Sequence, residues 1–396
     1  LRGGEAVGRY EAGTQVVVLP FVRQPDGEEV VIGRPEAGSF LALPPDAVAI
    51  LDDLAAGLTV GGAQERYRER HGELPDLAEF LELLEEKGFV FPFGASARGA
   101  SPSVSRYHFA QFPPPLARLL FSPPVLAAGG ALMLLAVVLT VLDPSLLPGS
   151  GALVFDRQFT APALGLFLTS YFMVFLHEMA HLVAARAYGV NSRLGVSHRL
   201  WMLVAETDLT GIWALPSRQR YLPLLAGPFL DGTIAAVLVV ALRWGALQPG
   251  AYQICRALLF LYLLQLLWQC YCFLRTDLYY LIANRFRCKN LMGDTEAFLR
   301  RRDLSHVPAA ELPVIRWYAV VYVLGRLLAI GTFVFLLLPV VWTYFAAVFA
   351  VLKAGFRADP EQFVDAALMG GIVLAHRGAG LWLWVRSLLE RRRAAV

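Results

Sequence analysis

The feature that most constrains this chain is a series of long apolar runs that occupies its C-terminal three quarters. A helix needs about 20 residues to cross a bilayer, and several runs reach or approach that length. We therefore expect membrane-spanning helices at 123–142, 162–187, 221–242, 251–274, 314–340 and 363–386. The fifth run continues as far as residue 352 or so, which leaves the number of spans within 314–386 open.

The composition agrees with a membrane protein and argues against two other classes. Of the 396 residues, 57% are hydrophobic and only 17% are charged, whereas soluble domains carry about 25% charged residues. This balance excludes a purely soluble protein, and the apolar content is too high for a disordered chain. The four cysteines lie in the apolar part without a CxxC pair, so we interpret them as buried small side chains.

The net charge of +3 is the sum of two oppositely charged parts. Residues 1–97 carry a net charge of −9, and the remainder carries +12. With a cytoplasmic N-terminus and six spans, the inner segments hold 19 Lys and Arg residues and the outer segments hold 5. Basic residues gather on the cytoplasmic side of membrane proteins. We therefore expect an integral protein of the cell membrane with both termini in the cytoplasm, in contact with membrane lipid.

The acidic N-terminal part has the pattern of a small α+β domain. Strands are expected at 15–23, 29–34 and 39–43, with a hairpin turn at Pro25-Asp26-Gly27. Helices are expected from Pro45, over 59–69 and over 76–87, before a short strand at 89–91. This order predicts a winged-helix-like fold. We place this domain at 1–92, a linker rich in Pro, Gly and Ser at 93–115, and a membrane domain at 116–396.

The run from Leu41 to Phe91 resembles the PqqD-like peptide-recognition modules of peptide-maturation pathways. The resemblance rests on a strand, a Pro-opened helix, a Thr-initiated helix and the sequence Leu-Leu-Glu-Glu-Lys-Gly-Phe-Val at 83–90. It implies that the leader segment of a precursor peptide adds as a strand to the edge of the sheet. A DNA-binding winged helix is the alternative, and the charge of −9 disfavours it because phosphate binding needs a basic face. We expect no nucleic-acid partner.

The second apolar run contains an HExxH motif at 177–181. On a helix, positions i and i+4 share a face, so His177 and His181 can reach one zinc ion, and Glu178 beside them can serve as a general base. An ionisable residue inside a membrane helix costs roughly 2.5–3.5 kcal/mol. Three such residues together favour a metal centre over a polar packing cluster.

A catalytic zinc ion takes three protein ligands and leaves one position for water, so the motif needs a further ligand. Asp277 is the first candidate, because it follows the apolar run that ends at Leu274 and is expected at the depth of the inner half of the HExxH helix. An ordinary helix N-cap is the competing interpretation of this residue. Asp231, between Gly227 and Gly232, is the alternative ligand.

From about residue 170 to 295 the chain resembles the site-2 protease family of intramembrane zinc metalloproteases. The matching features are HExxH at 177–181, Thr-Asp-Leu-Thr-Gly-Ile-Trp at 207–213, Gly-Pro at 227–228, Asp-Leu-Tyr-Tyr at 277–280 and Asn-Leu at 290–291. The resemblance implies that His177, His181 and Asp277 bind zinc and that Glu178 is the catalytic base. The secondary site candidates are Asp231, Asp208 and Tyr279.

The chain departs from the family pattern at two positions near the expected metal site. Leu278 replaces the usual glycine after the ligand aspartate, and Asp231 stands where many members have an asparagine. An ionised aspartate cannot donate a hydrogen bond to an oxyanion, so the oxyanion donor stays unassigned. The resemblance implies that 194–210 forms a membrane-edge strand that pairs with an unwound substrate; a simple connector is the alternative.

Together these features predict a zinc-dependent intramembrane endopeptidase, with about six membrane helices, that cleaves a leader-bearing precursor of a ribosomally made, modified peptide. A signalling site-2 protease that cuts a membrane-bound regulator is a second interpretation. A third is a peptide-binding or export accessory with a vestigial metal site. A prenyl-CAAX-type zinc protease differs in having a glutamate as its third ligand.

Overall fold

The computed structural model describes residues 10–93, 107–108, 111–155, 159–199, 202–288, 290–305 and 307–394. The chain divides into two compact units. The first unit comprises Leu1–Ala117, Leu182–Leu194 and Thr207–Pro223, and the second comprises Arg118–His181, Gly195–Glu206 and Leu224–Val396. The segments Leu182–Leu194 and Thr207–Pro223 of the expected membrane domain therefore pack with the N-terminal residues. Most of the expected linker at 93–115 lies outside the described residues.

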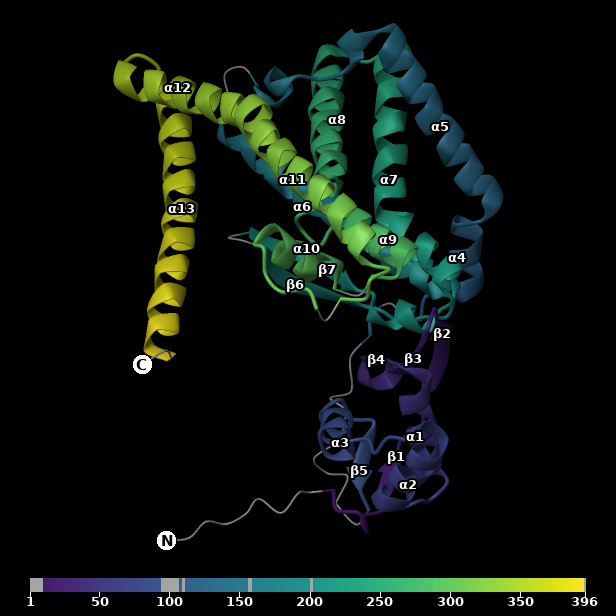
Figure 1. Cartoon of the computed structure of the whole chain (residues 1–396). Helices are drawn as coiled ribbons and strands as arrows, with labels where there is room; N and C mark the ends of the chain where they lie inside the picture. The colour runs from purple at the N-terminus through teal and green to yellow at the C-terminus, as the bar shows by residue number, and fades with distance from the viewer. Residues whose placement is uncertain are drawn as a thin grey trace. The chain divides into compact units, whose positions relative to one another are not determined.

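The N-terminal part of the first unit contains two small antiparallel sheets and three helices (Figure 1). One sheet pairs β1 (Val16–Val18) with β5 (Val90–Pro92), and the other has the order β2 (Val22–Asp26), β3 (Glu29–Arg34), β4 (Ser39–Leu43). The helices are α1 (Pro45–Ala55), α2 (Val60–His71) and α3 (Leu77–Glu86). These elements enclose one apolar core that includes Ile32, Leu51, Leu54, Leu77, Leu81, Leu84 and Phe89.

Local signals in the sequence explain where these helices begin and end. The Thr59 hydroxyl accepts a hydrogen bond from the Gly62 N–H, and the Asp76 carboxylate accepts one from Ala78, so each side chain caps the helix that follows. Gly72 ends α2 with a φ angle of +79°, in the left-handed region that glycine adopts without strain.

The expected strand at 15–23 is wrong as a single element, because it forms β1 and β2 in two different sheets. Pro20 separates them; proline has no N–H to donate to a ladder and is disfavoured inside a strand. The hairpin turn also differs slightly from the expectation. Asp26 pairs with Glu29, so the turn residues are Gly27 and Glu28, and Gly27 supplies the positive φ angle of +72°.

In the described part of the chain, five helical segments are long and apolar enough to cross a membrane. They are Pro114–Leu142, which contains α4 (Pro114–Leu120) and α5 (Pro123–Leu142), α6 (Thr160–Ala187), α7 (Ser217–Trp244), α8 (Pro249–Gln269) and Leu312–Ala354. The sixth expected span, 363–386, falls within α13 (Pro360–Ala394), which is not among these five. Many side chains in the second half of α13 lie outside the described residues.

The second unit is built on helices that pack through small and branched apolar side chains. Ala136 of α5, Val239 of α7 and Leu259 of α8 belong to one buried cluster, and Figure 1 shows these three helices beside one another. Other large apolar side chains face outward, among them Leu134 and Leu142 of α5, which are 65% and 77% exposed. Outward apolar surface of this kind is expected where helices face lipid.

The segment after α8 departs from the expected span at 251–274. The helix ends at Gln269, and a non-helical loop leads to α9 (Asp277–Phe286) and α10 (Leu291–Leu299). The loop is held by the Thr276 hydroxyl, which donates to the Gln269 carbonyl at 3.0 Å. Tyr279 and Tyr318 pack α9 against α11 (Leu312–Thr332) in a second apolar cluster.

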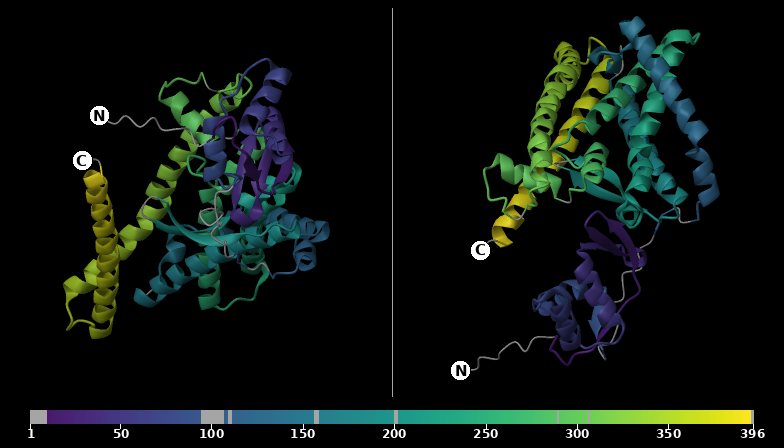
Figure 2. Two further views of the ribbon diagram at one scale, coloured as in Figure 1. Left: turned by 90° about the horizontal axis from the view of Figure 1, so that it is seen from below. Right: turned by 45° about the vertical axis from the view of Figure 1, so that its right-hand side comes forward.

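A continuous helix follows, in which α11 passes through a π-helical turn at Phe333–Leu337 into α12 (Leu338–Ala354) (Figure 2). Pro339 lacks the N–H that would continue the regular ladder, and a π-turn is a usual response to such an interruption. After α12 the chain turns back into α13. There Asp365 accepts hydrogen bonds from the N–H groups of Phe159 and Thr160, and so caps the start of α6.

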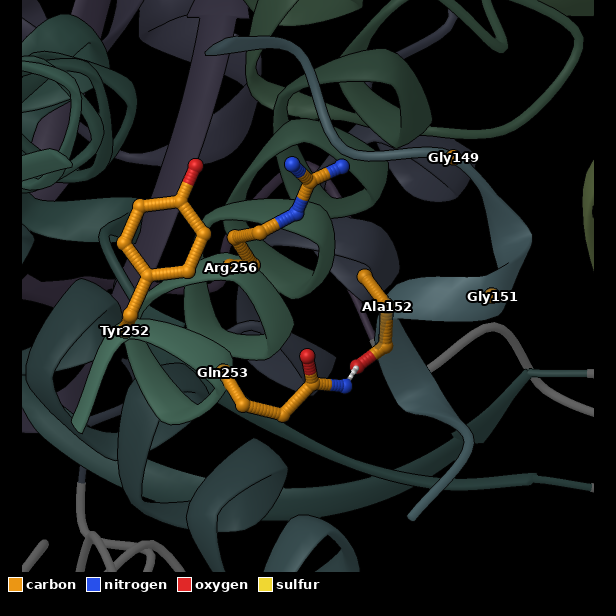
Figure 3. A pocket seen from close by; sticks show the side chains of 6 residues that line it. All are labelled: Gly149, Gly151, Ala152, Tyr252, Gln253 and Arg256. Atoms are coloured by element: carbon orange, nitrogen blue, oxygen red, sulfur yellow. Dashed lines mark hydrogen bonds between the residues drawn. The ribbon is translucent and has the colours of Figure 1, made fainter. Parts of the chain in front are cut away.

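Strands β6 (Arg193–Arg199) and β7 (Met202–Asp208) pair in a two-stranded sheet, so the segment expected as one strand at 194–210 contains two. A shallow pocket of about 390 Å³ lies at the start of α8, lined by Gly149, Gly151, Ala152, Tyr252, Gln253 and Arg256 (Figure 3). Its Gln253 amide donates to the Ala152 carbonyl at 3.0 Å.

Candidate metal centre

The two histidines of the HExxH motif lie on one face of α6, as their spacing predicts. His177 is 5% exposed and His181 is 2% exposed. Their Nε2 atoms are 3.1 Å apart. Two imidazole nitrogens so close together in a buried site can both donate their lone pairs to one metal ion.

Asp277, the expected third ligand, joins this pair from the first turn of α9. Its Oδ2 atom is 3.0 Å from Nε2 of His177 and 3.3 Å from Nε2 of His181. The cap of α9 is Thr276, so Asp277 is the first residue of the helix rather than its N-cap. Leu278 follows within the same regular helix with a negative φ angle, so the backbone at this position does not require the glycine of the family pattern.

The donor set fits a zinc ion in both type and spacing. Bonds from zinc to histidine nitrogen or carboxylate oxygen are about 2.0–2.2 Å, which places neighbouring ligands of a tetrahedron about 3.4 Å apart. The three separations in this cluster are 3.0, 3.1 and 3.3 Å. Two imidazoles and one carboxylate leave the fourth position for water, which is the composition of catalytic rather than structural zinc sites.

Gly227 of α7 forms the neighbouring wall of the cluster. A Cβ atom at this position would lie 2.4 Å from Nε2 of His181 and 2.5 Å from Nε2 of His177. Distances below 3.0 Å are not tolerated between such atoms, so a side chain would displace both imidazoles. The glycine therefore keeps the space beside the two donor nitrogens open.

Asp231, the alternative third ligand, lies on the other side of His177. Its Oδ2 atom is 2.6 Å from Nδ1 of His177, and it also accepts a hydrogen bond of 3.0 Å from the Gln265 side-chain amide. Nδ1 is the ring nitrogen that does not face Asp277. The structure thus assigns Asp277 to the donor cluster and Asp231 to the opposite edge of the imidazole.

The remaining candidates from the sequence occupy different places. Glu178 is half-buried on α6 and interacts electrostatically with His181. Asp208 contributes to the end of β7 instead: its carboxylate accepts hydrogen bonds from Arg193 at 2.8 Å and from the Thr210 N–H at 3.0 Å. Tyr279 is buried among the aromatic rings of Tyr280 and Tyr318 and has a packing role.

Sequence reasoning missed Gln265 and Gln269, which lie one turn apart on α8. The Gln265 side chain reaches Asp231, and the Gln269 side-chain oxygen accepts a hydrogen bond of 3.1 Å from the Asp277 N–H. The only signal in the sequence is the i, i+4 spacing of two amides within an otherwise apolar run.

Comparison of this chain with protein-family models, with characterised proteins and with solved structures found no match. The assignment of a function therefore depends on the geometry of the cluster.

Proposed function

We propose that this chain is a zinc-dependent intramembrane endopeptidase of the site-2 protease type. The observation that carries the proposal is the convergence of His177, His181 and Asp277, whose ligand atoms all lie within 4.8 Å of one another. Two of these residues lie on α6, a helix long and apolar enough to span a membrane. Ionisable groups in such a helix indicate function, and this donor set suits catalytic zinc.

Each residue of the site has its own role in peptide hydrolysis in this proposal. His177, His181 and Asp277 would hold the zinc ion, which would lower the pKa of a bound water to about 7 and polarise the scissile carbonyl. Glu178 lies directly beside the first ligand in the sequence and would take a proton from the attacking water and pass it to the leaving amine nitrogen. Gly227 leaves space beside the donor nitrogens.

The proposed substrate is a leader-bearing precursor peptide. The first unit contains small antiparallel sheets, and the edge strand of such a sheet is suited to pairing with an extended peptide. The two-stranded sheet of β6 and β7 offers a further edge. Pairing with it would hold the substrate extended, as a peptide bond must be before water can attack its carbonyl. In this proposal the chain lies in the cell membrane with both termini in the cytoplasm, as the distribution of basic residues favours.

The experiment is a cleavage assay with the full-length protein in detergent or liposomes and a short precursor peptide encoded beside it. We expect the wild type to cut the peptide, and Glu178→Gln to reduce the rate by about 10²–10⁴-fold while zinc remains bound. Glu361→Gln, which changes an exposed glutamate of α13, is the matched control and keeps full activity. Unreduced cleavage by Glu178→Gln contradicts the proposal, and zinc binding without hydrolysis of any precursor favours an accessory role.

A further inference from the structure

Asp231 presents a buried carboxylate to the ring nitrogen of His177 that lies away from the donor cluster. The residue is 1% exposed, and its Oδ2 atom is 2.6 Å from Nδ1 of His177. An ionised carboxylate has no hydrogen to donate, so Nδ1 carries the hydrogen in this contact. Nε2 of His177 then keeps its lone pair, on the side where Asp277 and His181 lie.

The way in which Asp231 is held indicates that its role concerns His177. Gln265 donates its side-chain amide to the same Oδ2 atom at 3.0 Å. The other oxygen, Oδ1, is buried and has no hydrogen-bond partner within the described residues. A carboxylate kept only to hold helices together would be expected to use both oxygens, since an unsatisfied buried acceptor costs about 1–3 kcal/mol.

The second amide on the same face of α8 supports a ligand of the cluster directly. Gln269 accepts a hydrogen bond from the backbone N–H of Asp277 through its side-chain oxygen, at 3.1 Å. Gln265 and Gln269 thus act on two different carboxylates, one beside a ligand and one that is itself a ligand. The polar face of α8 is directed at the candidate metal centre.

We propose that Asp231 is a positioning residue of this metal centre, which fixes the tautomer and orientation of His177 and is itself held by Gln265. The inference deepens the proposed function and depends on it, because a divalent metal ion must bind at Nε2. Groups that hydrogen-bond to a ligating histidine orient the ring and raise its basicity as a ligand. Asp231 touches neither the metal position nor the substrate in this account.

The test is the zinc affinity of the full-length protein in detergent, measured by competition with a chromophoric chelator. Asp231→Leu removes the acceptor, and we expect it to weaken zinc binding by about 10–100-fold. Asp231→Asn is expected to fall between this variant and the wild type, because an amide oxygen can still accept the Nδ1 hydrogen without the charge. Gln265→Leu leaves Asp231 in place and should weaken binding by a smaller factor.

Asp365→Asn is the matched control, since Asp365 of α13 is another carboxylate of the same unit and accepts hydrogen bonds from the start of α6 rather than from the metal centre. Its zinc affinity should equal that of the wild type. Wild-type affinity in Asp231→Leu, or an equal loss in Asp365→Asn, overturns the inference but leaves the proposed function standing. Should Asp231→Leu not fold, wild-type affinity in both Asp231→Asn and Gln265→Leu overturns it. A wild-type protein that binds no zinc overturns both.

Discussion

The Arg220 guanidinium donates a hydrogen bond of 2.6 Å to the carboxylate of Asp26, a residue 194 positions earlier in the chain. Arg220 is 1% exposed, and it also donates to the carbonyls of Trp213 and Leu215. It therefore joins the β2–β3 hairpin to the short helix η5 (Thr210–Ala214), which packs on the same sheet. The start of α7 is thereby part of the first unit.

This contact predicts a large effect of removing the arginine. Arg220→Met removes the buried ion pair between Arg220 and Asp26, and breaking a buried ion pair costs about 3–5 kcal/mol. We expect faster hydrogen exchange at 22–34 and 210–214, measured by mass spectrometry. Arg193→Met is the control, because the side chains of its ion pair with Asp208 are 49% and 30% exposed, and pairs open to solvent contribute about 1 kcal/mol or less. Equal exchange in both variants would show that the Arg220 contact is not stabilising.

Gly227 gives a second prediction, which concerns space rather than charge. Gly227→Ala places a Cβ atom about as close to two donor nitrogens as a zinc ion would be, so we expect it to abolish zinc binding with the protein still folded. The measurement is zinc per chain by elemental analysis. Gly130→Ala on α5 is the control, because a Cβ there meets no atom within 4 Å. Full zinc occupancy in Gly227→Ala would be inconsistent with the described geometry.

The cap of α6 gives a third prediction. Asp365 accepts hydrogen bonds from Phe159 at 2.6 Å and Thr160 at 3.1 Å, which satisfies two N–H groups at the start of the helix. Asp365→Ala should lower the free energy of unfolding by about 1 kcal/mol. A reduced thermal unfolding temperature together with faster exchange at 159–163 checks this. Glu361→Ala, at an exposed position of α13, the helix that contains Asp365, should change neither.

The fourth prediction concerns pH and the N-terminal helices. The Tyr67 hydroxyl donates a hydrogen bond of 2.7 Å to Asp46, and this bond lowers the pKa of Asp46 below its ordinary value of 3.8. A carboxyl group with a lower pKa in the folded state stabilises that state at neutral pH. The contribution is lost as the pH falls below about 4.

Tyr67→Phe removes this contribution. The variant should therefore show faster exchange than the wild type in 45–71 at pH 7, after correction for intrinsic rates, and the difference should be smaller at pH 3. An equal difference at both pH values would mean that the bond does not act through the ionised carboxylate.

Local signals made much of the first unit predictable. Thr59 and Asp76 cap the helices that follow them, and the glycines at 72 and 88 have the positive φ angles that end α2 and follow α3. The division of 15–23 into two strands was not predictable in this way. It depends on the pairing of β1 with β5, more than 70 residues away, and no local pattern encodes that partner.

In the candidate site, too, local features could be predicted from the sequence and long-range contacts could not. The spacing of His177 and His181 is a property of one helix and could be predicted from sequence alone. Asp277 and Asp231 both lie in or beside apolar runs, and the rotation of α7 and the end of α8 at Gln269 decide which one joins the cluster. The sequence could not show that Asp231 would meet Nδ1 of His177.

The proposed function requires that the cluster of His177, His181 and Asp277 holds a zinc ion. The most direct measurement is the zinc content of the purified full-length protein and of His181→Ala and Asp277→Ala, with Asp208→Ala as a control carboxylate outside the cluster. We predict about one zinc ion per chain in the wild type and in Asp208→Ala, and almost none in the two cluster variants. A wild type without zinc, or cluster variants that retain it, would contradict the claim.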